Sequence, residues 1–238
     1  MNGVGVIHTC KYNQMKKYLL LLFIVGAASR SHAQLQGQPL IDSLITRLAT
    51  AKEDTNKVML LDDLSLTYYS INPDEGLKYG QQGLALAEQL DWKLGKAYAY
   101  KVIAGNYGYG KSDFPNALKY YFDALKIHEE GGVKNEVAAT LMNIGIVYNS
   151  LEDYPKALDY MLRANKIDEE LGNKSGVAAN LGNIGQLYIS LGDTAKALES
   201  NIKSLDFYEA VGDKNGIARN LGLFEQLGDK NGAAKNFG

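Results

Sequence analysis

The stretch VAATLMNIG, residues 137–145, decides the fold because it returns as VAANLGNIG at residues 177–185, an offset of 40. The same offset relates three copies of a second motif, Asp-X-X-X-Ala-Leu, which begin at Asp113, Asp153 and Asp193. Repetition at a fixed period of this size is the sequence signature of a repeat protein. The sequence therefore predicts tandem units of about 40 residues, each too small to bury its own apolar surface alone.

Each unit is predicted to hold two helices. In the third copy, Leu141, Ile144, Gly145 and Tyr148 follow the spacing i, i+3, i+4, i+7, which places them on one helical face. A second stripe of the same period runs from Ala157 to Ile167. The small residues in the two stripes predict a close approach of the paired helices.

The ends of the second helix in each unit carry the residues that start and stop helices. Asp153 is predicted to cap its N-terminus, with Pro155 in the first turn, where a missing N–H does no harm. Gly172 is predicted to follow its C-terminus with a positive φ. The preceding and following copies place the same kinds of residue at Asp113, Pro115, Gly132, Asp193 and Gly212.

This pattern resembles the tetratricopeptide repeat, whose signature sets a large residue, Leu-Gly, Tyr, Ala and Phe at fixed spacings. The third copy supplies these residues at Leu141, Ile144-Gly145, Tyr148, Ala157 and Met161, and the fourth at Leu181, Ile184-Gly185, Tyr188 and Ala197. In the second copy Gly105 and Ala117 take the small positions, and Gly108 stands where tyrosine is expected. The units are similar to a 40-residue variant found in the N-terminal repeat regions of bacterial signalling receptors.

The resemblance implies an all-α fold, a right-handed solenoid of antiparallel helix pairs with about four repeats and a truncated fifth. The motif Asp-Lys-Asn-Gly at residue 213 returns only 16 residues later, which indicates that part of the fifth unit is missing. We expect a capping helix and linker over 34–55, repeats over 56–92, 93–132, 133–172 and 173–212, and the truncated repeat over 213–238.

The N-terminus is typical of a secretory signal peptide over residues 1–33. Lys16 and Lys17 precede ten apolar residues, 19–28, and the small residues Ser31 and Ala33 suit a cleavage site. The true start is predicted at Met15, and an uncleaved anchor is the alternative interpretation. We therefore expect export, with a periplasmic or secreted location and no membrane attachment after cleavage.

Charge argues against several partners. The predicted signal peptide holds four of the chain's 25 basic residues and none of its 27 acidic ones, so the remaining chain has a net charge of −6. Nucleic-acid binding needs clustered Lys or Arg, and no basic tract is present. A protein or peptide partner is the better prediction, and the oligomeric state stays open.

The residue types also argue against an enzyme, a metal or another cofactor. Cys10 lies within the predicted signal peptide, and His128 is the one histidine after it. A zinc site or a catalytic triad needs several histidine or cysteine ligands or a histidine with a suitably placed nucleophile, and one histidine does not supply these. His128 is predicted to be a structural cation at a helix C-terminus, where the helix dipole favours positive charge. The sequence GNYGYG at 105–110 lacks the Lys-Ser/Thr of a phosphate loop, and we interpret it as close helix packing.

The resemblance implies that the first helix of each pair lines a concave groove. The matching positions are Asn106, Tyr109, Met142, Asn143, Ile146, Asn149, Asn183, Gln186 and Ile189. Most are amides and aliphatic residues, which predicts a peptide held by amide hydrogen bonds and apolar pockets. Tyr100 and Tyr109 are candidates for an exposed aromatic patch.

Two functional classes remain open from the sequence. The first is a free-standing, exported scaffold for protein–protein interaction. The second is the truncated N-terminal sensor region of a transmembrane signalling enzyme, a histidine kinase or a nucleotide cyclase, which the incomplete fifth repeat favours.

Overall fold

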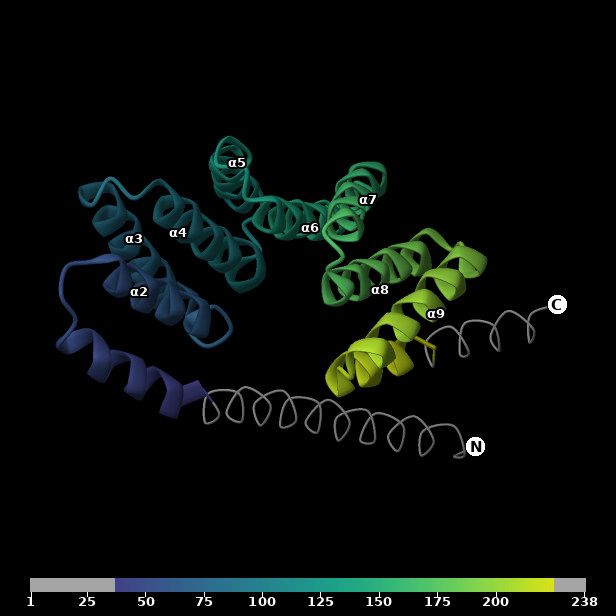
Figure 1. The fold of residues 1–238 in the computed structure, drawn as a ribbon, viewed down its shortest axis with the longest axis horizontal. Helices are drawn as coiled ribbons and strands as arrows, with labels where there is room; N and C mark the ends of the chain where they lie inside the picture. The colour runs from purple at the N-terminus through teal and green to yellow at the C-terminus, as the bar shows by residue number, and fades with distance from the viewer. Residues whose placement is uncertain (1–36, 225–238) are drawn as a thin grey trace, which may run out of the picture.

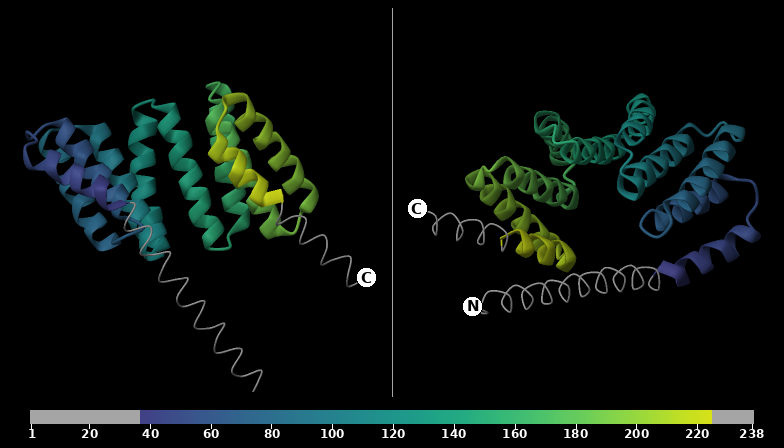
Figure 2. Two further views of the ribbon diagram at one scale, coloured as in Figure 1. Left: turned by 90° about the horizontal axis from the view of Figure 1, so that it is seen from below. Right: turned by 180° about the vertical axis from the view of Figure 1, so that it is seen from behind.

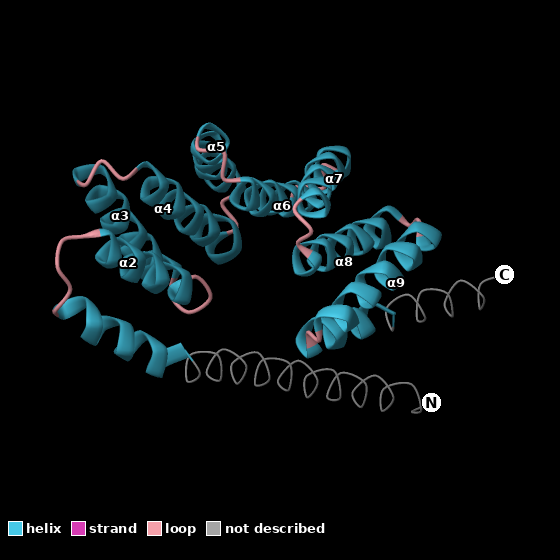
Figure 3. Ribbon diagram, viewed as in Figure 1, coloured by secondary structure: helices cyan, strands magenta, loops and turns pink. Residues whose placement is uncertain are grey.

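A computed structural model describes residues 37–224, and every regular element in that range is a helix (Figures 1 and 3). The predicted signal peptide and most of the truncated fifth repeat lie outside the described residues. A first helix covers 37–49 and a last one begins at residue 214. Between them lie α2 Thr55–Tyr68, α3 Pro73–Gln89, α4 Lys93–Gly105, a π-helical turn Asn106–Gly110, α5 Phe114–Glu130, α6 Lys134–Ser150, α7 Tyr154–Glu170, α8 Lys174–Leu191 and α9 Thr194–Val211.

The helices form a solenoid of neighbouring pairs, as predicted. The pairs α2/α3, α4/α5, α6/α7 and α8/α9 pack internally, and each pair packs on the next. Together they curve into an arc in which α5 and α7 stand on the outer side and α6 and α8 on the inner side (Figures 1 and 2). On the inner side α2 also contacts α4, and α6 contacts α8.

The helix over 37–49 covers the exposed side of the first pair. Its residues Ile41 and Leu44 are buried in one cluster with Leu60 and Leu64 of α2. Because a solenoid leaves an apolar face at each end, this helix removes the first unit's face from water.

The predicted helix caps are present. The side chain of Asp153 accepts a hydrogen bond from the backbone N–H of Lys156, and Asp113 and Asp193 do the same one unit before and after. Each capping aspartate thus satisfies a backbone donor that the helix itself leaves free. The predicted glycines Gly132, Gly172 and Gly212 have φ of 66°, 66° and 71°, the left-handed conformation that closes a helix.

The close approach within a pair is clearest at Gly145. A Cβ added there would lie 2.7 Å from Cγ of Met161 and 3.1 Å from the backbone oxygen of Ala157. A larger residue on α6 would therefore push α7 away, which confirms the predicted role of the small residue.

A stacked pair of tyrosines recurs in three units and shows which residues are equivalent. Tyr68 stacks on Tyr79 in the first unit and Tyr148 on Tyr160 in the third, with ring centroids 5.6 and 5.5 Å apart. In the second unit the pair is Tyr107 and Tyr120, at 5.7 Å. The prediction that Gly108 replaces the signature tyrosine was therefore wrong, because Tyr107 takes that place.

The π-helical turn explains the shift, because it accommodates one additional residue. In the third unit the N–H of Asp153 bonds to the carbonyl of Tyr148, five residues earlier, whereas Asp113 bonds to Tyr107, six residues earlier. The wider ring of a π-helix takes up such an insertion, and these turns are frequent at functional sites. The offset between the first helices of the two units is therefore 41, and buried Ala104 is the counterpart of Gly145.

Candidate partner-binding groove

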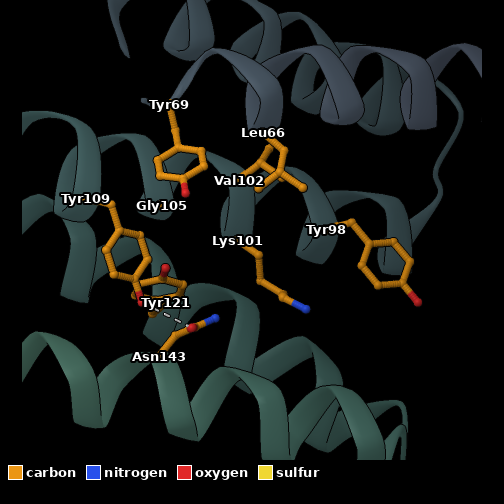
Figure 4. A pocket seen from close by; sticks show the side chains of 9 residues that line it. All are labelled: Leu66, Tyr69, Tyr98, Lys101, Val102, Gly105, Tyr109, Tyr121 and Asn143. Carbon is orange, nitrogen blue, oxygen red and sulfur yellow. Dashed lines mark hydrogen bonds between the residues drawn. The ribbon is translucent and has the colours of Figure 1, made fainter. Parts of the chain in front are cut away.

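A pocket of about 430 Å³ opens on the inner side of the arc at the π-turn. It is built by the C-terminal end of α2, by α4, by the π-turn and by α6, with one side chain from α5. Its lining is mainly aromatic and aliphatic (Figure 4) and consists of Leu66, Tyr69, Tyr98, Lys101, Val102, Gly105, Tyr109, Tyr121 and Asn143. This volume lies at the lower end of the range for ligand sites.

A chain of hydroxyl and amide groups forms one wall. Tyr121 hydrogen-bonds with its hydroxyl to that of Tyr109, and Tyr109 donates to Oδ1 of Asn143 at 3.3 Å. Burial raises the pKa of Tyr109 to about 12 and that of Tyr121 still further, so both are neutral phenols. Tyr109 as a whole residue is 47% exposed, and its ring meets Tyr69 edge-on with the ring centroids 6.2 Å apart. The wall therefore offers the pocket a fixed aromatic surface.

The opposite end of the pocket carries an ion pair. Nζ of Lys101 lies 2.5 Å from Oε2 of Glu136, and the two side chains are only 21% and 19% exposed. Lys101 also lies 6.0 Å from the ring centre of Tyr98. Because the carboxylate neutralises the one cation in the lining, the pocket presents no net charge.

His128 lies behind this ion pair and is fully buried. Its Nδ1 is 3.2 Å from Oγ1 of Thr140, and that hydroxyl donates to the carbonyl of Glu136. Nδ1 therefore carries the proton, and its N–H donates to Thr140. Burial, and secondarily Lys101, lower the pKa of His128 to about 4. The predicted structural role fits, but the predicted reason was wrong, because the ring is neutral and no cation sits at the helix end.

The structure separates the predicted groove residues into two places. Tyr109 and Asn143 line the pocket at the π-turn. Asn183 and Gln186 line a second, smaller hollow of about 220 Å³ near the last described helix, with Tyr208, Arg219 and others. Ile146 and Asn149 are half-buried and are not among the lining residues of either place.

Three predicted groove residues are packing residues instead. Asn106 is fully buried, and its amide donates to both oxygens of Ser65 and to the carbonyl of Val102. Met142 and Ile189 are 7% and 4% exposed and belong to apolar clusters. Asn106 was misassigned because an offset of 40 matches it to Ile146, whereas the offset of 41 matches it to Val147, which is also buried.

The aromatic prediction was half correct. Tyr109 is exposed, but Tyr100 packs against Tyr120 at 5.8 Å, away from the pocket lining. Sequence reasoning missed the pocket residues in α5 and at the C-terminal end of α2, which are Tyr121, Leu66 and the C-cap residue Tyr69. The one signal that could have indicated them is the additional residue of the second copy, which marks an irregular turn beside them.

The described residues contain neither a metal-binding cluster nor a helix that could cross a membrane. No group of three or more His, Cys, Asp or Glu side chains in residues 37–224 is arranged to hold a metal ion. Within the same range, no helix combines the length and the apolarity that crossing a membrane requires.

The geometry of paired helices stacked into an arc matches known families. Residues 136–210 match the family model for the tetratricopeptide repeat. This part of the chain carries tetratricopeptide repeats. No curated protein sequence matches it.

Several solved structures share this tetratricopeptide-repeat fold. Aspartyl phosphate phosphatase F from Bacillus subtilis superposes with a TM-score of 0.71 at 20% identity, over 92% of this chain and 63% of that one. A Rap protein complexed with competence and sporulation factor superposes with a TM-score of 0.66 at 22% identity, over 82% of this chain and 60% of that one. The Rap conjugation gene regulator of a plasmid, in complex with the Phr peptide, superposes with a TM-score of 0.67 at 16% identity, over 83% of this chain and 53% of that one. The chain thus spans less than two thirds of the length of these proteins.

Proposed function

We propose that this protein is a scaffold for protein–protein interaction that binds a peptide segment of its partner along the inner side of the arc. The observation that carries the proposal is the pocket at the π-turn, which three successive first helices build together. Two neighbours of the same fold were solved in complexes, with competence and sporulation factor and with the Phr peptide. Those ligands belong to those proteins, and here they support only the class of partner.

The groups along the inner side suit a peptide backbone. Asn143, Asn183 and Gln186 each offer a side-chain amide that both donates and accepts. A peptide has the same alternation of N–H and C=O groups, so amides can pair with it whatever its sequence. Specificity then comes from pockets that take particular side chains. The protein acts by binding, and the phosphatase activity in one neighbour's name is not part of this proposal.

Selection of peptides tests the proposal directly. The full chain is immobilised, a displayed library of random peptides is selected on it, and the affinities of the recovered peptides are measured by fluorescence anisotropy. The variants Asn143→Arg and Asn183→Arg place bulky cations on the inner side, and we expect each to weaken binding about tenfold or more. Gln82→Arg, an exposed amide on α3, is the matched control and should bind as the unchanged chain does.

The proposal fails if no peptide is enriched over a library selected on an unrelated protein. It also fails if peptides are recovered but the two inner-side variants bind them with unchanged affinity.

We also propose that the chain is exported. The basic, apolar and small-residue sequence of residues 1–33 supports this. N-terminal sequencing of the protein from fractionated cells is expected to find a chain that begins at Gln34, outside the cytoplasm. Recovery of a cytoplasmic chain that retains residues 1–33 would contradict export.

A further inference from the structure

Gly105 forms part of the pocket lining at the C-terminal end of α4, and nothing in its surroundings requires a glycine. Glycine weakens a helix relative to alanine, so a helical glycine calls for a structural reason. The usual reasons are a positive φ or a close neighbour. Gly105 has φ of −59° and ψ of −44°, which any residue adopts in a helix.

The surroundings of Gly105 differ from those of nearly all other described helical glycines. A Cβ at Gly80 would lie 2.8 Å from Ile103, and one at Gly145 would lie 2.7 Å from Met161. At Gly105 the nearest atoms would be the hydroxyl of Tyr121 at 3.8 Å and a ring carbon of Tyr109 at 4.0 Å. Of the described helical glycines, only Gly222 shares such open space. The missing side chain at Gly105 therefore leaves room in the pocket and does not serve helix packing.

The charges around the pocket indicate what can occupy that room. A cationic ligand would find no free carboxylate, because the lining holds none and the neighbouring Glu136 is already paired with Lys101. An anionic ligand would compete with Glu136 for Lys101, which is already paired and largely buried. An uncharged group gives neither penalty, and it gains contact with the exposed surfaces of Leu66, Tyr69 and Tyr109, which are 54%, 38% and 47% exposed.

We propose that the pocket takes one large apolar side chain of the bound peptide, aromatic or branched aliphatic, and that Gly105 is the floor on which this side chain rests. The proposal rests on the peptide-binding function proposed above and names the residue class that the groove selects. Tyr69 and Tyr109 already meet edge-on and present ring surface to the pocket, an arrangement that a third ring can extend. The chain of hydroxyls from Tyr121 through Tyr109 to Asn143 fixes the position of this wall.

Single blocked amino acids test the pocket without the rest of a peptide. The probes are the N-acetyl amides of tryptophan, phenylalanine, leucine, lysine and glutamate, and binding to the full chain is measured by saturation-transfer NMR. The tryptophan, phenylalanine and leucine probes are expected to bind with Kd on the order of a millimolar, and the two charged probes at least about tenfold more weakly.

The pair Gly105→Leu and Gly105→Ala locates the binding. A leucine side chain at this position would extend into the open space of the pocket and fill it. The chain should therefore still fold, but it should no longer bind the apolar probes. Alanine adds one methyl group in ordinary contact with Tyr109 and Tyr121, so this variant should still bind the apolar probes. A circular dichroism melt of both variants shows that each is folded.

The outcomes separate this inference from the function on which it rests. If charged probes bind as well as apolar ones, if no probe binds, or if Gly105→Leu leaves apolar binding unchanged, the inference is wrong. Library peptides give the second test: Gly105→Leu should weaken them about tenfold or more, and unchanged affinity would overturn the pocket assignment while leaving the peptide scaffold intact. A failure to recover any peptide would instead refute the scaffold itself.

Discussion

The second and third units, residues 93–130 and 134–170, share their helix caps and their stacked tyrosines, yet the pocket of about 430 Å³ opens at the second. They differ by one residue, which the second unit accommodates in the π-turn Asn106–Gly110. Each residue of an α-helix turns the chain by about 100°, so an insertion redirects every side chain that follows within the helix. The turn confines this rotation to five residues.

Because the offset between the first helices is 41, two glycines that the 40-residue offset pairs lie at different places in their units. Gly145 lies against α7 and keeps two helices close, whereas Gly105 faces open space in the pocket. Ala104, fully buried, takes over the packing role in the second unit. Gly105 therefore corresponds to Ile146 of the third unit, and the second unit has a glycine on the binding side where the third has an isoleucine.

Deleting one residue from the third unit and one from the second should give the largest difference in stability between the two units. Without Ile146, the residues of α6 that follow turn away from the core, and the free energy of unfolding should fall by about 3–5 kcal/mol. Without Gly108, the second unit regains the spacing of the third, so its stability should change by less than about 1 kcal/mol while the apolar probes no longer bind. Urea unfolding followed by circular dichroism measures both. Equal losses of stability would show that the π-turn is not an insertion.

A valine at Gly145 should give the next largest effect. Its branched side chain would collide with Met161 and with the backbone oxygen of Ala157, and we expect a loss of about 2–4 kcal/mol in urea unfolding. Gly105→Val is the control at the position 40 residues earlier and should stay within about 1 kcal/mol of the unchanged chain. A Gly145→Val chain of undiminished stability would contradict the close approach seen here.

The units also differ in the polar residue that the second helix buries against the next unit. His128 bonds to Thr140, whereas Asp168, at the same place in the third unit, accepts from Asn180 at 2.7 Å. The pKa of His128 is about 4 in the folded chain against an ordinary 6.5. Between these values the unfolded chain binds the proton and the folded chain does not, so stability rises with pH in this window and is lost as pH falls through it.

We therefore expect the free energy of unfolding to fall by about 1–3 kcal/mol between pH 7 and pH 4.5 through His128 alone. The surrounding charges are Lys101 and Glu136. Buried Asp62, whose pKa burial raises to about 8, acts in the opposite sense, so the measurement is the difference between the unchanged chain and His128→Phe at each pH. A difference that does not vary with pH would contradict the neutral buried ring.

The smallest expected effect is a gain. Gly105→Ala puts a better helix former at a position with room for it, and the free energy of unfolding should rise by about 0.5–1 kcal/mol. Thermal and urea unfolding detect a change of this size. A loss of stability would mean that Gly105 is needed for packing and would remove the argument that it serves the pocket.

The sequence was sufficient for features that depend on neighbouring residues. Capping aspartates, prolines in first turns and glycines with positive φ act within a few positions of the chain, so Asp153, Pro155 and Gly172 could be placed without a structure. The 40-residue period likewise predicted stacked helix pairs, because a repeated apolar stripe has to be covered by its neighbour.

The candidate site was only partly predictable, because it depends on where one additional residue is absorbed. The sequence indicates that the second copy is irregular, but the insertion could lie in a loop or at any turn of the helix. Contacts made outside the helix select the π-turn: the amide of Asn106 reaches Ser65 in the first unit, and Tyr107 stacks on Tyr120 of α5 in its own unit. These contacts join residues distant in the chain, so the period predicted that a groove exists, and only the tertiary structure decided that Gly105, Tyr109 and Tyr121 build its pocket while Asn106 is buried behind it.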